Sequence, residues 1–209
     1  MRADARRNAA KLRVAAARLF RERGLQVSLK EIARTAGVSP GTLYNLFGDR
    51  EKLIDDVVAE PAGARLDAVA AQALAHEDPW DGFVFYAEKV CELQATDRAL
   101  NDVLTRRYPG AVRLMEVCDD IQAAAERIIE RAQHAGTLRL DFTREDLLFV
   151  LATNARLAQA AMHAAPDVWR RCVAFVLDGL RTEAGRPLPA GPLTPQQATQ
   201  VLATMATMQ

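Results

Sequence analysis

The 209-residue chain has no long apolar run: none approaches the roughly 18 residues expected of a membrane-spanning helix. Charged residues near its N-terminus are not followed by the apolar stretch of a signal peptide. We therefore expect a cytoplasmic protein without a membrane partner.

Cysteines are also few. Cys91, Cys118 and Cys172 are odd in number and far apart, and each lies in an apolar helical pattern. This favours buried free thiols in a reducing compartment over a disulfide framework. A redox-sensing role for them stays open, because it depends on exposure and a low thiol pKa.

Recognisable catalytic motifs are absent as well. There is no glycine-rich phosphate loop, no nucleophile elbow and no framed pair of carboxylates. His76, His134 and His163 are not spaced with Cys or carboxylates as metal ligands are. We expect no enzyme activity, no metal and no cofactor.

The formal net charge is zero, but the charge is unevenly distributed. Residues 1–53 hold twelve Lys and Arg against five Asp and Glu, and the remainder is acidic. A basic N-terminal part on an acidic body is typical of a protein that binds phosphates of nucleic acid.

The stretch Ser28–Phe47 predicts two short helices joined by a tight turn. Ser28 with Glu31 has the spacing of a capping box, and Gly37 can adopt the positive φ that ends the first helix. Ser39 followed by Pro40 begins the second helix. This is the helix-turn-helix pattern, whose second helix enters the DNA major groove.

Most of the remaining sequence has helical periodicity, so the predicted fold class is all-α. We expect a helix-turn-helix domain over 1–48, a larger helical domain over 49–184, and a Pro/Gly-rich linker with a short helix over 185–209. Pro61 and Gly63 interrupt the helix that follows Asp49, which predicts either one kinked helix or two consecutive ones. The segment TLRLD, residues 137–141, is expected to be an extended link.

Extending the helix-turn-helix stretch on both sides shows a resemblance to the tetracycline-repressor (TetR) family. It spans residues 10–58, and the matching positions are Ala17–Phe20, Gly24, Ser28, Ile32–Ala33, Ala36–Ser39, Gly41–Tyr44, Phe47 and Leu53. The resemblance implies a two-part regulator that binds palindromic operators as a homodimer and is released by a small molecule. Arg50, where relatives usually have Lys, and Leu46, where they often have an aromatic residue or His, depart from the family pattern.

Residues with hydroxyl, amide and cationic groups around the second short helix are the predicted DNA contacts. Asn45 is the candidate for bidentate recognition of adenine, and Tyr44 for contact with phosphate and sugar. Leu43 and Phe47 are predicted to be core. The predicted contacts are Ser28, Lys30, Ser39, Pro40, Gly41, Thr42, Tyr44, Asn45, Arg50 and Lys52.

The body contains aromatic, sulfur-bearing and amide side chains that are candidates for lining an apolar ligand cavity. Aromatic and Met residues at helical spacing are also typical of plain core, and the sequence leaves both readings open. The predicted ligand-binding residues are Trp80, Phe83, Tyr86, Tyr108, Met115, Cys118, Gln122, Phe149 and Asn154, with Phe85 a further candidate.

The last two body helices, Leu147–Met162 and Val168–Glu183, carry small residues beside large apolar ones, and the resemblance points to them as the dimer seam. A face buried within one chain would look the same. The sequence thus predicts a homodimeric repressor released from a double-stranded DNA operator by a small apolar or aromatic effector. A DNA-binding protein that organises chromosomes without sensing a ligand is the alternative.

Overall fold

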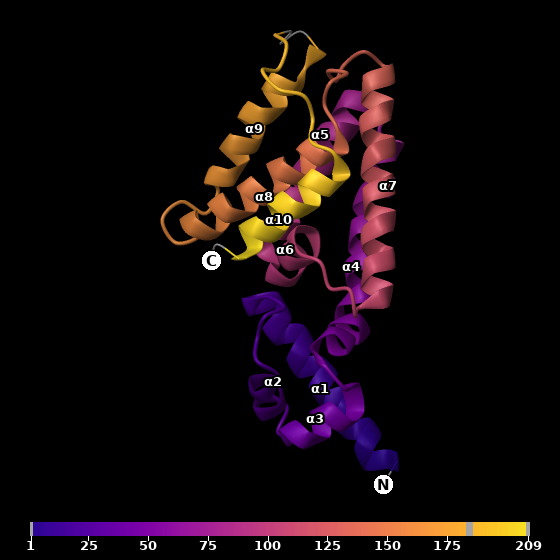
Figure 1. The fold of residues 1–209 in the computed structure, drawn as a ribbon, viewed down its shortest axis with the longest axis vertical. Helices are drawn as coiled ribbons and strands as arrows, with labels where there is room; N and C mark the ends of the chain where they lie inside the picture. Colours follow the sequence, from indigo (N-terminus) through magenta and orange to yellow (C-terminus); the bar gives the residue numbers. More distant parts are fainter. Residues whose placement is uncertain (1, 183–185, 208–209) are drawn as a thin grey trace.

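The computed structural model describes residues 2–182 and 186–207, and over these it confirms the predicted all-α class. A small head at one end of an elongated molecule is joined to a larger body (Figure 1). The head consists of α1 Arg2–Arg23, α2 Leu29–Thr35 and α3 Pro40–Phe47. The body consists of α4 Arg50–Ala75, α5 Pro79–Thr96, α6 Arg98–Thr105, α7 Val112–His134, α8 Arg144–Ala161, α9 Val168–Leu180 and α10 Pro195–Thr207.

The head has a small core to which all three helices contribute. Leu12, Phe20, Ile32 and Leu43 are completely buried in it. Between α2 and α3 the chain turns at Gly37, which has a φ of 65°. Because a side chain disfavours that conformation, glycine at this position lets the two helices cross closely.

The connection from head to body is α4, a single helix that continues through Pro61 and Gly63. Asp49 caps its N-terminus by accepting a hydrogen bond of 2.9 Å from the Lys52 backbone N–H. One turn further on, the Asp55 carboxylate accepts a hydrogen bond of 2.8 Å from the backbone N–H of Leu114 at the start of α7. This contact joins the head-proximal end of α4 to the longest helix packed against it.

The segment predicted to be an extended link makes an isolated antiparallel bridge in which Leu138 pairs with Arg181. The Arg139 N–H donates to the Leu180 carbonyl at 3.1 Å, and the Thr182 N–H donates to the Thr137 carbonyl at 3.2 Å. The chain after α9 is thereby fixed beside the end of α7. Residue Glu183, the predicted end of α9, lies outside the described residues, and the helix itself ends at Leu180.

The C-terminal helix α10 lies across α8 on the surface of the body (Figure 1). Its N-terminus has the predicted capping box: the Thr194 N–H donates to Gln197 Oε1 at 2.9 Å, and the Gln197 N–H donates to Thr194 Oγ1 at 3.3 Å. None of the described helices is long and apolar enough to cross a membrane.

Candidate DNA-binding surface and ligand cavity

The exposed side of α3 carries the predicted DNA contacts, while its other side is core. Leu43 and Phe47 are buried against α1 and α2, as predicted. Tyr44 keeps 49% of its surface exposed, and Asn45 beside it is exposed. The recognition helix therefore presents a phenol and an amide to the solvent.

The N-terminus of α3 is organised by Ser39 and Thr42. The Ser39 hydroxyl accepts a hydrogen bond of 3.2 Å from the Thr42 backbone N–H, and the two hydroxyls lie 2.9 Å apart. Pro40 and Gly41 are exposed beside them. Backbone N–H groups at a helix N-terminus favour an anion, so this end of α3 is suited to a DNA phosphate.

Ser28 and Lys30, at the start of α2, are both exposed. The Ser28 side chain accepts a hydrogen bond of 3.3 Å from the Glu31 backbone N–H, which confirms Ser28 as the cap. The other half of the predicted capping box is replaced, because the Glu31 carboxylate accepts a hydrogen bond of 2.5 Å from Arg23 Nη1. The Lys52 ammonium, after α3, lies 3.4 Å from the Asp49 carboxylate, and both side chains are exposed. Such an exposed ion pair is weak, so Lys52 can exchange it for a phosphate.

Arg50 has a structural role that the sequence did not indicate. Its Nη1 donates hydrogen bonds to the Leu25 and Val27 carbonyls, at 2.9 Å and 2.6 Å, and the side chain is only half-exposed. Because its Nη1 is engaged with the loop between α1 and α2, Arg50 braces the head, and its contact with a phosphate stays a prediction.

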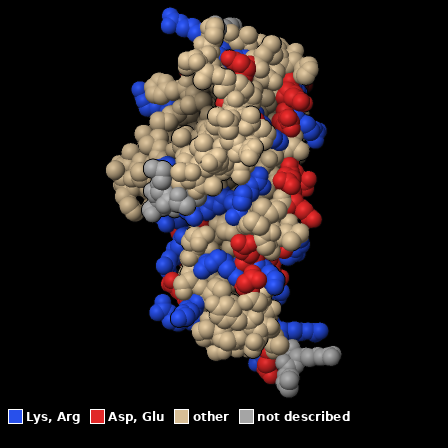
Figure 2. Space-filling model, viewed as in Figure 1, with Lys and Arg blue, Asp and Glu red and all other residues tan. Residues whose placement is uncertain are grey.

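Charge on the surface is distributed in bands. In the face shown in Figure 2, Lys and Arg lie at the margins of the head, whose middle is largely uncharged, and a further group of them crosses the molecule just below α10. Lys and Arg on the head can contact the phosphates of a DNA groove.

The body contains a partly open cavity of about 460 Å³ lined by α6, the link after it, α7, α8 and α10. Its apolar lining is Val103, Leu104, Ile121, Leu148, Ala198, Leu202 and Ala203, and its polar lining is Gln26, Thr105, Arg106, Arg107, Tyr108, Cys118, Gln122, Arg144, Glu145 and Thr199, with Pro195 at one edge. The volume is in the range of sites for small organic ligands, and the lining is more polar than is usual for them.

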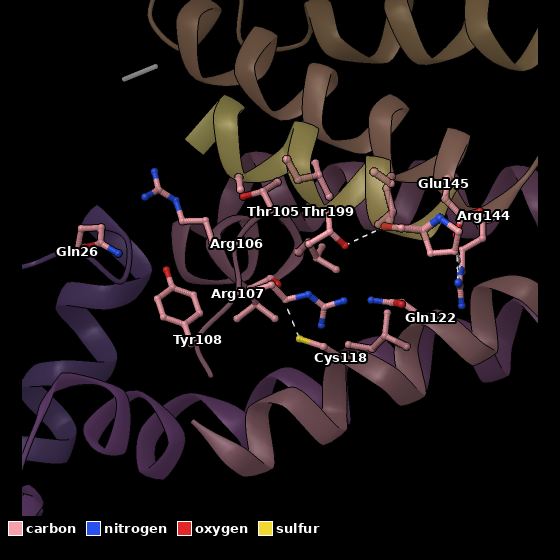
Figure 3. A pocket seen from close by; sticks show the side chains of 18 residues that line it. Gln26, Thr105, Arg106, Arg107, Tyr108, Cys118, Gln122, Arg144, Glu145 and Thr199 are labelled. Carbon is pink, nitrogen blue, oxygen red and sulfur yellow. Dashed lines mark hydrogen bonds and ion pairs between the residues drawn. The ribbon is translucent and has the colours of Figure 1, made fainter. Parts of the chain in front are cut away.

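Three of the predicted ligand residues line this cavity: Tyr108, Cys118 and Gln122. In Figure 3 the side chains of Arg107 and Gln122 extend toward each other above Cys118. Burial raises the pKa of the Cys118 thiol and, together with the charge of Asp102, raises the pKa of Tyr108 to about 12. Both groups are therefore neutral near pH 7.

The other predicted ligand residues lie elsewhere. Trp80, Phe83 and Tyr86 are buried in the core along α5, where Phe83 packs edge-on against Phe142 with ring centroids 5.8 Å apart. Met115 is half-buried against the same core. These aromatic residues at helical spacing therefore form part of the core and do not line the cavity.

Phe149 and Asn154 lie on α8 outside the cavity. Phe149 is half-exposed. Asn154 is buried, with neither its amide oxygen nor its amide nitrogen in a hydrogen bond. Phe85, the further candidate, packs its ring 5.1 Å from that of His76.

The sequence did not predict that arginines and residues of α10 line the cavity. Arg106 and Arg107 follow the short helix α6, and Arg144 begins α8, where its guanidinium lies 3.0 Å from the Glu145 carboxylate. No local pattern marks these positions, since exposed arginines at helix ends are common in any soluble domain.

The cavity reaches the head. Gln26, from the loop between α1 and α2, forms part of its lining. Beside it, the backbone N–H of Leu25 donates a 2.7 Å hydrogen bond to the buried carboxylate of Asp102 in α6. Gly24 has a φ of 86°, and a Cβ there would lie 2.7 Å from Asp102 Oδ2, so the contact requires glycine. Burial raises the pKa of Asp102.

The small residues of α8 that were proposed for a dimer seam face inward. Ala152, Ala155 and Ala158 are buried within the chain. Of α8 and α9, it is α9 that has a large apolar side chain on its outer face. Phe175 keeps 61% of its surface exposed, and Gly179 has open space around it. Any seam through these helices must use this outer face.

An all-α protein with a helix-turn-helix head and a body enclosing a cavity has the architecture of a DNA-binding regulator controlled by its body. The family comparisons agree. Residues 12–57 match the model of bacterial regulatory proteins of the tetR family, and residues 78–182 match the C-terminal domain of SbtR-like transcriptional regulators. The chain belongs to the TetR family and is a DNA-binding transcriptional regulator; regulators of this family are generally non-enzymatic.

Among curated proteins, the chain is similar to the HTH-type transcriptional regulator BetI of Rhizobium meliloti (strain 1021). The two are 44% identical over 63 residues, which is 29% of this chain and 31% of BetI. The match thus spans less than a third of that relative.

Two solved structures show the same fold. RolR in complex with resorcinol has a TM-score of 0.53 and 22% identity, covering 91% of this chain and 99% of that one. FadR of Bacillus subtilis in complex with stearoyl-CoA has a TM-score of 0.61 and 15% identity, covering 82% of this chain and 98% of that one.

Proposed function

We propose that this regulator is a homodimeric repressor that binds a palindromic operator through α3 and is released when a small apolar or aromatic molecule occupies the body cavity. The observation that carries the proposal is that the cavity and the head share a wall. Gln26 of the head lines the cavity, and α6, whose Val103 and Leu104 line it, is hydrogen-bonded to the head through Asp102.

On the DNA side, the groups on α3 divide into two kinds. Asn45 is exposed and has the donor and acceptor needed to pair with adenine in the major groove. Ser39, Thr42 and Tyr44 offer hydroxyls, and Lys30 a charge, to the phosphates on either side. Phosphate contacts fix the position of the head, and Asn45 reads the sequence.

On the ligand side, the effect on DNA follows from the geometry of α6. A molecule packed against Val103 and Leu104 pushes on the helix whose Asp102 accepts the Leu25 N–H. A shift of α6 therefore moves the loop between α1 and α2, and with it the head. Two heads must meet two half-sites at a fixed separation, so a small movement weakens both contacts. The ligand must bind the released arrangement more tightly, or no population shifts.

The ligand class follows from the lining and is supported by the fold. Eight apolar side chains line the cavity beside its polar groups, which include Arg107, Gln122 and Thr199. Two proteins of this fold are seen in complex with ligands, RolR with resorcinol and FadR with stearoyl-CoA. Both are apolar or aromatic molecules with polar ends.

For the dimer, we infer a seam on the outer face of α9 and the adjoining part of α8, around Phe175. Replacing Phe175 with Glu would place a charge in that seam, and sedimentation equilibrium should then show a monomer at concentrations where the wild type is a dimer. Leu140→Glu is the matched control, since Leu140 is 81% exposed but lies outside both helices. A monomeric wild type would contradict the dimer.

The function is tested by selecting bound duplexes from random DNA and then screening small molecules for release by fluorescence anisotropy. We expect an enriched palindrome and at least one apolar or aromatic compound that lowers operator affinity. An enriched palindrome without a releasing compound would favour the alternative of a DNA-organising protein. Failure to enrich any sequence would contradict the role in sequence recognition.

A further inference from the structure

The C-terminal helix α10 forms the outer wall of the cavity. Five of the lining residues belong to it: Pro195, Ala198, Thr199, Leu202 and Ala203. The matches to the two family models end at residues 57 and 182, so α10 lies outside both of them. The two family models therefore do not describe this wall.

The helix is capped at its N-terminus and attached to α8 near its C-terminus. Its N-terminus is closed by the reciprocal hydrogen bonds of Thr194 and Gln197. Near its C-terminus, the Met205 carbonyl accepts a hydrogen bond from the Arg156 guanidinium of α8. A cation at a helix C-terminus also interacts favourably with the helix dipole. Between these ends, Ala198 is only 2% exposed.

The cavity lining contains both polar and apolar groups. Arg107 and Gln122 form a polar group beside Cys118, from the link after α6 and from α7 (Figure 3). The ion pair of Arg107 with Asp119 is long, at 3.8 Å, and largely exposed, so its guanidinium can turn to an anionic ligand group. Leu202 of α10, with Ile121 and Leu148, supplies apolar surface.

From this arrangement we propose that α10 is the specificity-determining wall of the ligand site, and that the site takes an apolar molecule with a carboxylate or similar acceptor group. The acceptor group binds at Arg107 and Gln122, and the apolar part ends against Leu202. The side chain at position 202 then sets the length of ligand that fits. The inference rests on the proposed function, because it names the ligand class and a further part of the same site.

The first test measures whether α10 covers the cavity, and needs no ligand. Each cysteine is labelled with N-ethylmaleimide, and the rate is followed by peptide mass spectrometry. In the chain ending at residue 186, Cys118 should react about tenfold faster than in the full chain, because loss of α10 exposes it. Cys91, which is completely buried in α5, should stay unreactive and thereby report that the body is folded.

Point variants separate loss of the wall from loss of the fold. Leu202→Asp places a charge against the cavity and should also accelerate labelling of Cys118. Val201→Asp is the matched control, because Val201 is the neighbouring residue of α10 and does not line the cavity. Equal Cys118 rates in the wild type, the Leu202→Asp variant and the truncated chain would overturn the assignment of α10 as the wall.

The second test measures ligand length with the straight-chain carboxylates from hexanoate to tetradecanoate, by their effect on the Tm. A ligand that binds only the folded protein raises the Tm in proportion to its affinity and concentration. Leu202→Ala should lengthen the best-bound carboxylate by about two methylene groups, and Leu202→Trp should shorten it, because the wall recedes or advances. Val201→Ala and Val201→Trp should leave the optimum unchanged.

Two outcomes would contradict the ligand class. If no carboxylate of the series raises the Tm of the wild type, or if the matching alcohols bind equally well and Arg107→Gln has no effect, the acceptor group is not recognised as proposed. These outcomes are distinct from failure of the proposed function. Operator release by an unrelated compound would leave that function intact, whereas length-dependent binding without release would support the wall and contradict the function.

Discussion

The head and the body build their functional surfaces in different ways. In the head, the reading surface comes from one continuous stretch, α2 to α3, and its helix caps are hydrogen bonds between residues three apart. In the body, the cavity gathers side chains from the loop before α2, from α6 to α8 and from α10. A surface made of local contacts tolerates change in the rest of the chain, whereas a cavity made of distant segments depends on all of them.

The largest effect is expected from a substitution in the core that holds α3 in the head. Leu43 is completely buried between α3 and the other head helices. Leu43→Ala should lower the free energy of unfolding of the head by about 2–5 kcal/mol and abolish operator binding. Thermal unfolding followed by circular dichroism measures the change, and Val14→Ala, at a 73% exposed position of α1, serves as the control that should change little.

The next largest effect is expected at the reading surface itself. Asn45→Ala removes an exposed amide and should weaken binding to the selected operator by about 1–3 kcal/mol, with loss of base preference at one position in each half-site. The Tm should stay unchanged, because Asn45 is exposed. An altered Tm with intact base preference would instead assign Asn45 to the structure of the head.

Arg50→Ala sharpens the distinction between bracing and binding. Loss of its hydrogen bonds to the Leu25 and Val27 carbonyls should lower the stability of the head by about 1–2 kcal/mol. The dependence of operator affinity on salt concentration should keep its slope. If this salt slope falls by about one and the stability is unchanged, Arg50 contacts a phosphate, as the sequence predicts.

Lys30→Ala should have the smallest effect and the opposite pattern. Lys30 is exposed at the start of α2, so its loss should leave stability within about 0.5 kcal/mol of the wild type. If it contacts a phosphate, the salt slope falls by about one. Comparing the Arg50 and Lys30 variants therefore tests whether each of these charges near α3 stabilises the head or binds DNA.

How much the sequence predicts differs between the two regions for a physical reason. The caps at Ser28 and Ser39, the turn at Gly37 and the buried Leu43 follow from residues within one or two helical turns. The same holds for the capping box at Thr194. What that last helix covers depends on the packing of α8 and α6, which lie far away in the chain, and no periodicity encodes it.

The ligand residues show the same limit. Trp80, Phe83 and Tyr86 were candidates because large side chains line cavities, but large side chains also fill cores, and helical spacing is identical in both cases. Gln122 was found because an amide among apolar residues needs a partner. The sequence did not predict Arg107, because an arginine after the end of a helix is equally common where no cavity is present.

The central claim is that occupation of the cavity is transmitted to the head through α6, and the contact of Asp102 with Leu25 tests it most directly. The measurement is operator affinity with and without the releasing compound, for the wild type and for Asp102→Ala, which removes the acceptor of the Leu25 N–H, with compound affinity determined separately by calorimetry. We expect the compound to weaken operator binding by about tenfold in the wild type, a coupling of about 1.4 kcal/mol. In the variant, the compound should weaken operator binding by less than about threefold. The affinity of the free variant for the compound should differ from that of the wild type by no more than about 1.4 kcal/mol. Equal weakening in both proteins would contradict transmission through this contact.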